Sequence, residues 1–391
     1  MKRKSILRSS GVQTLLVSLA CILLGLLVGF VALLIINPAN AWKAIVTIVA
    51  NFLNSSRVNL QLKNLGNTLV KTAPLLMCAL SVLFAYKAGL FNIGAAGQYV
   101  IGAGASLYAA LAWHLPWYVC LLLALFCGAI LGAISGALKA LCNVNEVISC
   151  IMLNWISLYL VNMLLTNVKE TTSPYTYKLS TAGAQCFIPS LGMGSLFGNN
   201  LYVGLALILA VVISVVIWVI LEKTKLGYEL KATGYNRNAA RYCGMQEKKN
   251  LILTMAIAGA LAGAGAAMLY LTGFTEWQTT QSSVPGMGFN GIAAAFLGGL
   301  NPIGAIFSSF FIQHITDGGA NLTTLGFPSQ ISDLISSLII YLCGFVMFFK
   351  MTLNKGLDQY ESKRGLMDET NVNAEPEKIN EEENQEGGEQ A

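Results

Sequence analysis

Long apolar runs, separated by short polar stretches, dominate the chain from its beginning to about residue 350. A helix needs roughly 20 apolar residues to cross a bilayer, and ten segments approach this length, the eighth and ninth being short. They are Thr14–Ile36, Thr68–Tyr86, Ile93–Ala112, Trp117–Ala140, Val147–Leu165, Leu201–Leu221, Leu251–Leu271, Met287–Leu300, Ile303–Ile315 and Ile331–Phe349. The pattern predicts an all-α polytopic membrane protein with about ten transmembrane helices. Ala41–Leu53 is amphipathic and too short to span, so we expect it at the membrane interface.

Composition and charge agree with this pattern and add an orientation. Only 11% of residues are charged, whereas about a quarter is usual in soluble domains. With the N-terminus inside, eighteen of the 24 Lys and Arg residues fall in cytoplasmic segments, as the positive-inside rule requires. We therefore expect both termini in the cytoplasm, with residues 1–12 as a cytoplasmic N-terminus and a transmembrane domain at 13–355. Residues 356–391 are acidic and nearly free of apolar side chains, which predicts a disordered tail.

Two apolar segments are interrupted by Gly and Asn, which predicts short or broken helices near Gly89–Gln98 and Gly286–Pro302. Broken backbone in a membrane is tolerated only against protein or water, so polar residues in and near these segments are candidates for a transport pathway. An amide and an indole that lie deeper in the fifth predicted span can meet a polar cyclic solute by hydrogen bonding and stacking. The candidates are Asn92, Gln98, Asn154, Trp155, Phe289 and Asn290. The alternative is a packing role, in which amides tie helices together.

Glycines at four-residue spacing predict close helix contacts. Gly128, Gly132 and Gly136 lie on one face of the fourth predicted span, and Gly259 and Gly263 form a second pair in the seventh.

Several function classes lack the residues that they need. The chain has no G-x-x-x-x-G-K-[ST] motif, and its two histidines are far apart, so we expect no P-loop, no catalytic residue and no metal site. Asp317 and Asp333 are placed by the outer ends of the last spans, where we expect water to solvate them. The absence of a midplane acid argues against proton-driven transport.

The segment 222–250 is the longest basic internal loop, with seven Lys and Arg residues against three acids. We expect it in the cytoplasm. The residues that follow Gly234 predict a short surface helix, and such a helix is typical of a contact surface for a cytoplasmic partner.

The stretches KAGLFNIGAAGQ, LKALCNVNEVISCIMLNWI, LGYELKATGYNRNAARYCGM and AGALAGAGAAM through GFNGIAAAFLGGLNPIGA cover most of residues 87–305. Together they resemble the permease subunits of ATP-binding-cassette (ABC) importers in the branched-chain amino acid and simple-sugar permease superfamily. The second stretch is similar to the branch that serves nucleosides and works with basic-membrane-protein-type lipoproteins. Many members of the family carry Glu where this chain has Ala96, so no charged role is expected at that position.

This resemblance implies a multi-pass plasma-membrane subunit that forms half of a translocation pathway. Its implied partners are membrane lipid, a second, paralogous permease, a cytoplasmic ABC ATPase with two cassettes and an extracytoplasmic substrate-binding lipoprotein, without nucleic acid. ATP and Mg²⁺ would be held by the ATPase, and this chain would need no cofactor.

The family's coupling helix, which docks on the ATPase, maps onto Gly227, Lys231, Ala232, Gly234, Asn236, Ala239, Ala240 and Gly244. In this interpretation, small side chains at Ala239 and Ala240 permit close approach to the ATPase, and Gly234 ends or bends the preceding turn.

Three alternatives stay open at this point. The same machine could carry ribose, another simple sugar or branched-chain amino acids. A stand-alone secondary transporter or channel would also contain broken helices, but it would not need a patterned basic loop. An integral-membrane enzyme lacks a visible nucleophile, metal site or acid–base pair.

Overall fold

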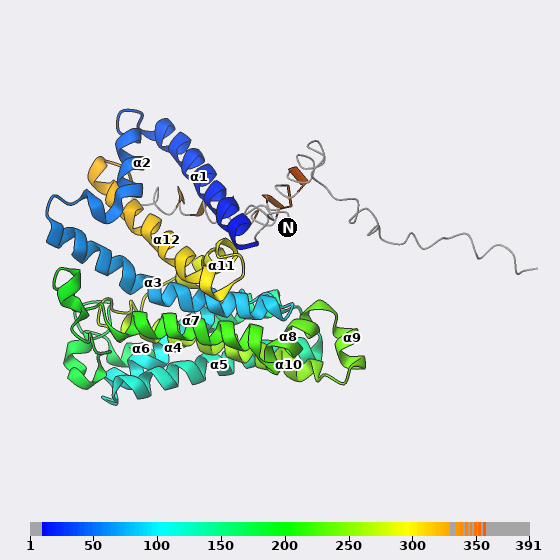
Figure 1. The fold of residues 1–391 in the computed structure, drawn as a ribbon. Coiled ribbons are helices and arrows are strands. Elements are labelled where there is room, and N and C mark those ends of the chain that lie inside the picture. Colours follow the sequence, from blue (N-terminus) through cyan, green and yellow to red (C-terminus); the bar gives the residue numbers. More distant parts are fainter. Residues whose placement is uncertain are drawn as a thin grey trace, which may run out of the picture. The chain divides into compact units, whose positions relative to one another are not determined.

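The computed structural model describes residues 10–328 and isolated positions between 334 and 356. Contacts divide the chain into residues 1–346 and residues 347–391, and every helix labelled in Figure 1 lies in the first unit. The predicted acidic tail after residue 356 lies outside the described residues, as does Asp333.

Helices connected by loops make up the described part of the chain, which contains no strand apart from two isolated bridges. The helices are α1 (Ser10–Ile36), α2 (Ala41–Ala50), α3 (Val58–Lys87), α4 (Ala95–Leu111), α5 (Trp117–Cys142), α6 (Glu146–Leu165), α7 (Leu205–Lys223), α8 (Lys225–Tyr235), α9 (Arg237–Tyr242), α10 (Glu247–Tyr270), α11 (Met287–Leu297) and α12 (Pro302–Ala320). Six of them, α1, α3, α5, α6, α7 and α10, are long and apolar enough to span a bilayer. The predicted all-α polytopic fold is confirmed.

The predicted spans correspond to described helices except the tenth, Ile331–Phe349, most of which lies outside the described residues. The count of ten spans and the orientation of the termini stay predictions. One boundary was wrong: α3 begins at Val58 rather than near Thr68. Polar residues extend this helix because they find partners, as when Asn64 donates to Ser55 Oγ at 3.2 Å and Thr68 donates to the Asn64 carbonyl at 3.3 Å.

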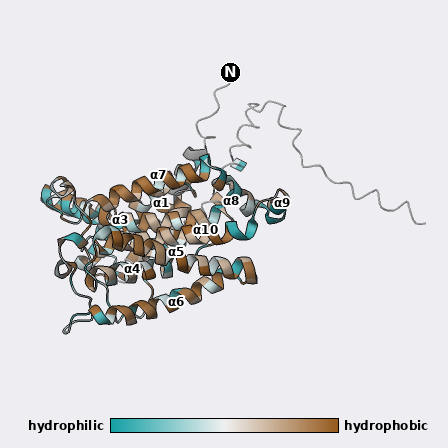
Figure 2. Cartoon of the chain, turned by 90° about the horizontal axis from the view of Figure 1, so that it is seen from below, coloured by the Kyte–Doolittle hydropathy of each residue, from teal (hydrophilic) through white to brown (hydrophobic). Residues whose placement is uncertain are grey.

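Two ends of the helix assembly serve as landmarks. One end, called here the α8–α9 end, also carries the end of α3, the α5–α6 turn and the start of α10. The opposite end carries the long segment 166–204, called here the outer loop, which contains four short 3₁₀ helices. Hydrophilic colour gathers at these ends while the helices between them are largely hydrophobic (Figure 2). By the charge-based prediction, the α8–α9 end faces the cytoplasm.

The core is built around α3, α4 and α10. In the apolar stretches that could span a bilayer, 89% of α3 and 72% of α10 is buried. In α1, α5, α6 and α7 the buried share is one third or less. The outer helices leave apolar side chains exposed, for example Leu122 and Phe126 on α5 and Val212 and Val215 on α7. Such faces are suited to lipid or to another apolar protein surface.

The two glycine faces predicted from spacing pack against each other. A Cβ atom on Gly128 would overlap the carbonyl oxygen of Gly259, and one on Gly132 would overlap that of Met255. Gly263 in turn lies against the backbone of Ala124. The backbones of α5 and α10 therefore approach closely along this seam, which confirms the predicted helix contact.

Both predicted helix breaks are present. Residues 88–94 run as turns and irregular backbone between α3 and α4, starting with Gly89 at φ +72°. Residues 271–286 connect α10 to the short helix α11, and residues 298–301 separate α11 from α12. Each break places backbone polar groups outside a regular helix, where they need other partners.

We expect Gly132→Val to destabilise the fold by at least the about 1–3 kcal/mol typical of overpacking, because the new side chain has to separate α5 from α10. Thermal unfolding of the purified protein in detergent would measure this effect. Ile134→Val, on the exposed face of the same helix, is the matched control and should unfold like the wild type. Equal unfolding temperatures for both variants would contradict the seam.

Candidate functional site

Three buried polar side chains close the first helix break. Asn92 donates to Ser81 Oγ at 2.9 Å and to Gln98 Oε1 at 2.8 Å, and Gln98 donates back to Asn92 Oδ1 at 3.2 Å. All three residues are buried. The reciprocal amide pair therefore connects the irregular segment to α3 and α4. This geometry matches the packing alternative, and the assignment of Asn92 and Gln98 to the pathway stays a prediction.

Asn154 connects the same region to α6. Its Oδ1 accepts a hydrogen bond from the Gly97 amide at 2.8 Å, and its Nδ2 donates to the Ile93 carbonyl at 3.1 Å. Two backbone groups at the start of α4 are satisfied in this way, which a buried helix end requires. Asn154 is 3% exposed and turns inward.

The neighbouring Trp155 points the other way. It is 42% exposed and stacks on Tyr159, with ring centroids 6.2 Å apart and an angle of 25° between the planes. The two aromatic residues are four apart and so share one face of α6. The stacked pair presents a flat aromatic surface away from the core. Of its two residues, only Trp155 was among the predicted site residues.

The start of α11 also lies beside the first turn of α4 and carries exposed side chains. Gly288 packs on the Ala96 backbone so closely that a Cβ would overlap it. Phe289 is exposed and Asn290 partly exposed. Because Ala96 contacts α11 and Gly97 contacts Asn154 of α6, α6 and α11 flank the first turn of α4. Trp155, Phe289 and Asn290 thus belong to elements on either side of one helix start.

The polar run Gln278–Gly286, which precedes α11, was missed as a site element in the sequence analysis. Its beginning is fixed to α6: Trp277 Nε1 donates to Asn162 Oδ1 at 2.9 Å, and Asn162 Nδ2 donates to the Gln281 carbonyl at 2.9 Å. The Thr279 amide also donates to the Pro174 carbonyl of the outer loop at 2.9 Å. The length of this polar stretch between two apolar segments was the sequence feature that could have identified it.

The basic loop folds into α8 and α9, which are joined at Asn236. Thr224 caps α8 by accepting from the Gly227 amide at 3.3 Å, and Asn236 caps α9 by accepting from the Ala239 amide at 3.0 Å. Lys231 forms an ion pair with Glu222 at 3.1 Å. The predicted short helix after Gly234 is therefore α9, and its N-cap is a residue that the resemblance had assigned to coupling.

Several of the proposed coupling residues support this segment from within. Gly227 is buried against Ile220 and Leu221 of α7. Gly234 lies one residue before the end of α8 at Tyr235, and its role in ending or bending this turn stays a prediction. A Cβ on Gly234 would lie 2.5 Å from Ala88 C, so this glycine permits close contact with the turn after α3.

The two alanines of the coupling segment differ in exposure. Ala240 is 3% exposed and packs inward, while Ala239 is exposed. Ala232 is half-buried, and Gly244 ends the segment in a left-handed conformation, at φ +80°. Tyr235 and Tyr242, which were not among the predicted residues, are 97% and 92% exposed. The free surface of this segment therefore includes Ala239 and two aromatic side chains, beside exposed polar and charged residues such as Asn238 and Arg241.

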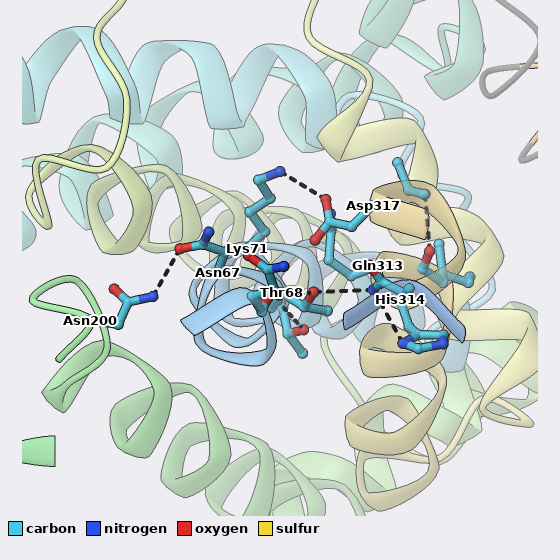
Figure 3. Close-up of polar contacts among 12 residues, drawn as sticks. Asn67, Thr68, Lys71, Asn200, Gln313, His314 and Asp317 are labelled. Carbon is cyan, nitrogen blue, oxygen red and sulfur yellow. Dashed lines mark hydrogen bonds and ion pairs between the residues drawn. The ribbon is translucent and has the colours of Figure 1, made fainter. Parts of the chain in front are cut away.

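Asp317 is not simply solvated, as had been expected. It pairs with Lys71 of α3 at 2.8 Å, and Gln313 Nε2 donates to the same carboxylate oxygen at 3.0 Å (Figure 3). The other oxygen, Oδ2, is buried without a hydrogen-bond partner among the described residues. Asn51, which follows α2, bridges Thr68 of α3 and His314 of α12. These contacts tie α12 to the outer-loop half of α3.

A pocket of about 500 Å³ opens at the outer-loop end. Its walls come from the outer loop, the segment Gly273–Glu276 and the last turns of α4 and α10. Within the described part of the chain, no group of three His, Cys, Asp or Glu side chains is arranged to hold a metal ion.

Comparison with known proteins gave consistent matches. Residues 64–344 match the family described as "Branched-chain amino acid transport system / permease component". The nucleoside ABC transporter permease protein NupB of Lactococcus lactis is 33% identical over 88% of this chain and 94% of its own length. The guanosine ABC transporter permease protein NupP of Bacillus subtilis is 33% identical over 83% and 92%. The glucose ABC transporter permease protein TsgB13 of Haloferax volcanii is 29% identical over 84% and 87%. No solved structure matched the chain.

We expect Asn154→Leu to lower the free energy of unfolding by about 1–3 kcal/mol for each backbone group left without a partner. Thermal unfolding in detergent would measure the loss. Trp155→Leu, one residue away on the exposed face, is the control and should retain the wild-type stability. A stable Asn154→Leu variant would show that the Gly97 and Ile93 groups find other partners.

Proposed function

Because the chain belongs to the family of branched-chain amino acid transport system permease components, we propose that it is the permease subunit of an ATP-driven importer for nucleosides. The observation that carries this proposal is the similarity to NupB and NupP, which extends over more than four fifths of the chain in both cases. As a multi-pass protein of the plasma membrane, it would provide a route for the solute and leave ATP hydrolysis to another subunit.

The exposed residues that flank the start of α4 suit an uncharged solute with a planar ring. Trp155 and Tyr159 present a stacked aromatic surface, and Phe289 and Asn290 add a third ring and an amide. Aromatic faces stack on bases, and an amide can pair with polar ring edges. None of these four side chains is charged, whereas an amino acid substrate has two charged groups to be matched.

A simple sugar is the second candidate because TsgB13, named for glucose, is 29% identical over 84% of this chain. A sugar shares the neutral, hydroxylated character that this surface suits. It lacks a planar base, so it would use the Trp155–Tyr159 pair less well.

The proposed pathway requires a second permease. The aromatic and amide surface beside α4 is open on a single chain, and an amide or irregular backbone that faces lipid is strongly disfavoured. A paralogous permease that covers this face would complete the route and shield it from lipid.

We propose α8 and α9 as the docking surface for a cytoplasmic ABC ATPase with two cassettes, which would hold the ATP and Mg²⁺. The segment is basic, capped at both helix starts and anchored to the bundle by Gly227 and Gly234. Its fully exposed Tyr235 and Tyr242 are of the residue type that dominates binding energy at protein interfaces. A substrate-binding lipoprotein would meet the opposite, outer-loop end. Because ATP would be hydrolysed on the ATPase, this subunit itself would carry out no chemistry.

Uptake of labelled guanosine and uridine in cells with and without the gene tests the substrate. We expect gene-dependent uptake that excess unlabelled nucleoside abolishes and that excess ribose or leucine leaves unchanged. Uptake should also stop when the ATPase subunit is deleted. Nucleoside uptake that is unaffected by loss of this gene, together with lost ribose or leucine uptake, would assign the substrate to the sugar or amino acid alternative. Uptake that survives ATPase deletion would favour a stand-alone transporter.

Substitution at the exposed alanine tests the docking surface. Ala239→Arg introduces a long charged side chain on the free face of α9, and we expect it to reduce co-purification of the ATPase and nucleoside uptake at least tenfold while membrane insertion is unchanged. Ala239→Ser is the matched control, because a small side chain keeps the approach close. Wild-type ATPase recovery with Ala239→Arg would place the interface elsewhere.

A further inference from the structure

Residues 281–286 lie inside the membrane-spanning part of the fold rather than above it. Helix α6 has 20 residues and is about 30 Å long, which matches the thickness of the hydrocarbon layer. Gln281 is bonded to Asn162, one turn below the end of α6. At its other end, the segment leads into Gly288, which packs on Ala96 beside Gly97, and Gly97 bonds to Asn154 near the middle of α6.

The depth of the segment follows from these two anchors. Asn162 and Asn154 are eight residues apart on one helix, which is about 12 Å along its axis. Residues 281–286 therefore descend from the outer-loop end to the middle of the bilayer thickness. They do so as irregular backbone, because α11 begins only at Met287.

Most backbone amides of this segment are unpaired. In the described part of the chain, the amides of Ser282, Ser283, Val284 and Gly286 have no hydrogen-bond partner. Ser282, Ser283 and Gly286 are also exposed. Unpaired backbone groups cannot face hydrocarbon, where each costs several kcal/mol. The first helix break, residues 88–94, shows the other solution, since its polar groups are buried and bonded to Ser81, Gln98 and Asn154.

We propose that Gln281–Gly286 is a substrate-contacting segment that lines the outer half of the translocation pathway and recognises an uncharged, hydroxylated solute. The proposal rests on the proposed function, because it assigns a binding element to the same route. The location of the segment is argued from its burial, depth and hydrogen bonding and not from the family comparison.

The chemistry of the segment and its neighbourhood defines what it recognises. Gln281 Oε1 is buried without a hydrogen-bond partner among the described residues, so its acceptor capacity is unused, and a solute hydroxyl or amine that reaches it would satisfy it. The Ser282 and Ser283 hydroxyls and the free backbone amides add donors. Asn162, which holds the segment, is seven residues after Trp155 and three after Tyr159, so the stacked pair lies on the face of α6 that the segment approaches. Sugar hydroxyls would thus meet the segment while a planar base meets the aromatic pair.

Accessibility of Ser283→Cys in the complete transporter on intact cells tests the lining. A membrane-impermeant maleimide should label this cysteine, and excess guanosine should slow the labelling at least fivefold. Ser195→Cys in the exposed outer loop should be labelled with no protection, and Ile130→Cys on the apolar face of α5 should stay unlabelled. Among the described residues, the exposed native cysteines are Cys142 and Cys243, which lie at the α8–α9 end and should not react from outside.

The outcomes separate this proposal from the proposed function. Failure of Ser283→Cys to react, while Ser195→Cys reacts, would overturn the lining, and so would labelling that no solute slows. Protection by ribose or leucine but not by guanosine would support the lining and overturn the nucleoside assignment.

A second measurement examines Gln281. Loss of an acceptor that has no partner in the free protein should leave the unfolding temperature unchanged or raise it. We expect Gln281→Leu to do this and yet to raise the KM for nucleoside uptake at least tenfold. Gln281→Asn, which retains the amide, should recover part of the affinity. Unchanged uptake by Gln281→Leu would exclude Gln281 as a contact.

Discussion

The need to pair every backbone polar group inside a membrane constrains this protein more than any other interaction. Helices satisfy the requirement internally, but irregular backbone interrupts the described helices, and two such segments, residues 88–94 and 281–286, lie at the candidate site. At residues 88–94 the solution is a set of buried side-chain amides. Asn92 and Gln98 bond each other, and Asn154 donates to the Ile93 carbonyl. At residues 281–286 the amides of Ser282, Ser283, Val284 and Gly286 have no such partners among the described residues. The same physical rule therefore predicts a packed interior at the first break and a water-filled surface at the second.

A continuous chain of close contacts runs from the proposed docking surface to this region. Gly234 near the end of α8 packs on the backbone of Ala88 and Gly89, where the first break starts. That break leads to the first turn of α4, which contacts α11 through Ala96 and α6 through Gly97. Side chains larger than glycine cannot be accommodated at Gly234 or Gly288 without moving the backbone. These contacts link α8 to the helices that flank the proposed pathway.

Hydrophobic periodicity and charge were sufficient to predict the all-α membrane fold, because span length and loop charge are local properties. Glycine spacing also predicted the α5–α10 seam, since a repeat of four residues marks one helix face wherever its partner lies. The breaks at Gly89–Gln98 and Gly286–Pro302 were likewise visible, because Gly, Asn and Pro interrupt helices by their own backbone and side-chain chemistry. The basic segment 222–250 was recognisable as a surface because its excess of Lys and Arg is also a local property.

The direction in which each side chain points was decided only by the tertiary structure. Asn154 and Trp155 are adjacent in sequence and were given the same role, yet one is buried and bonded while the other is exposed. Ala239 and Ala240 divide in the same way, and Asp317 found Lys71 across 246 residues of chain. The polar run before α11 looked like an ordinary loop until its hydrogen bonds to Asn162 placed it beside α6. The sequence by itself thus determined the helices, their breaks and the charged end, because these depend on local composition. The pairing of helices, and with it the depth and partners of each polar group, depends on contacts between distant segments that only the folded chain defines.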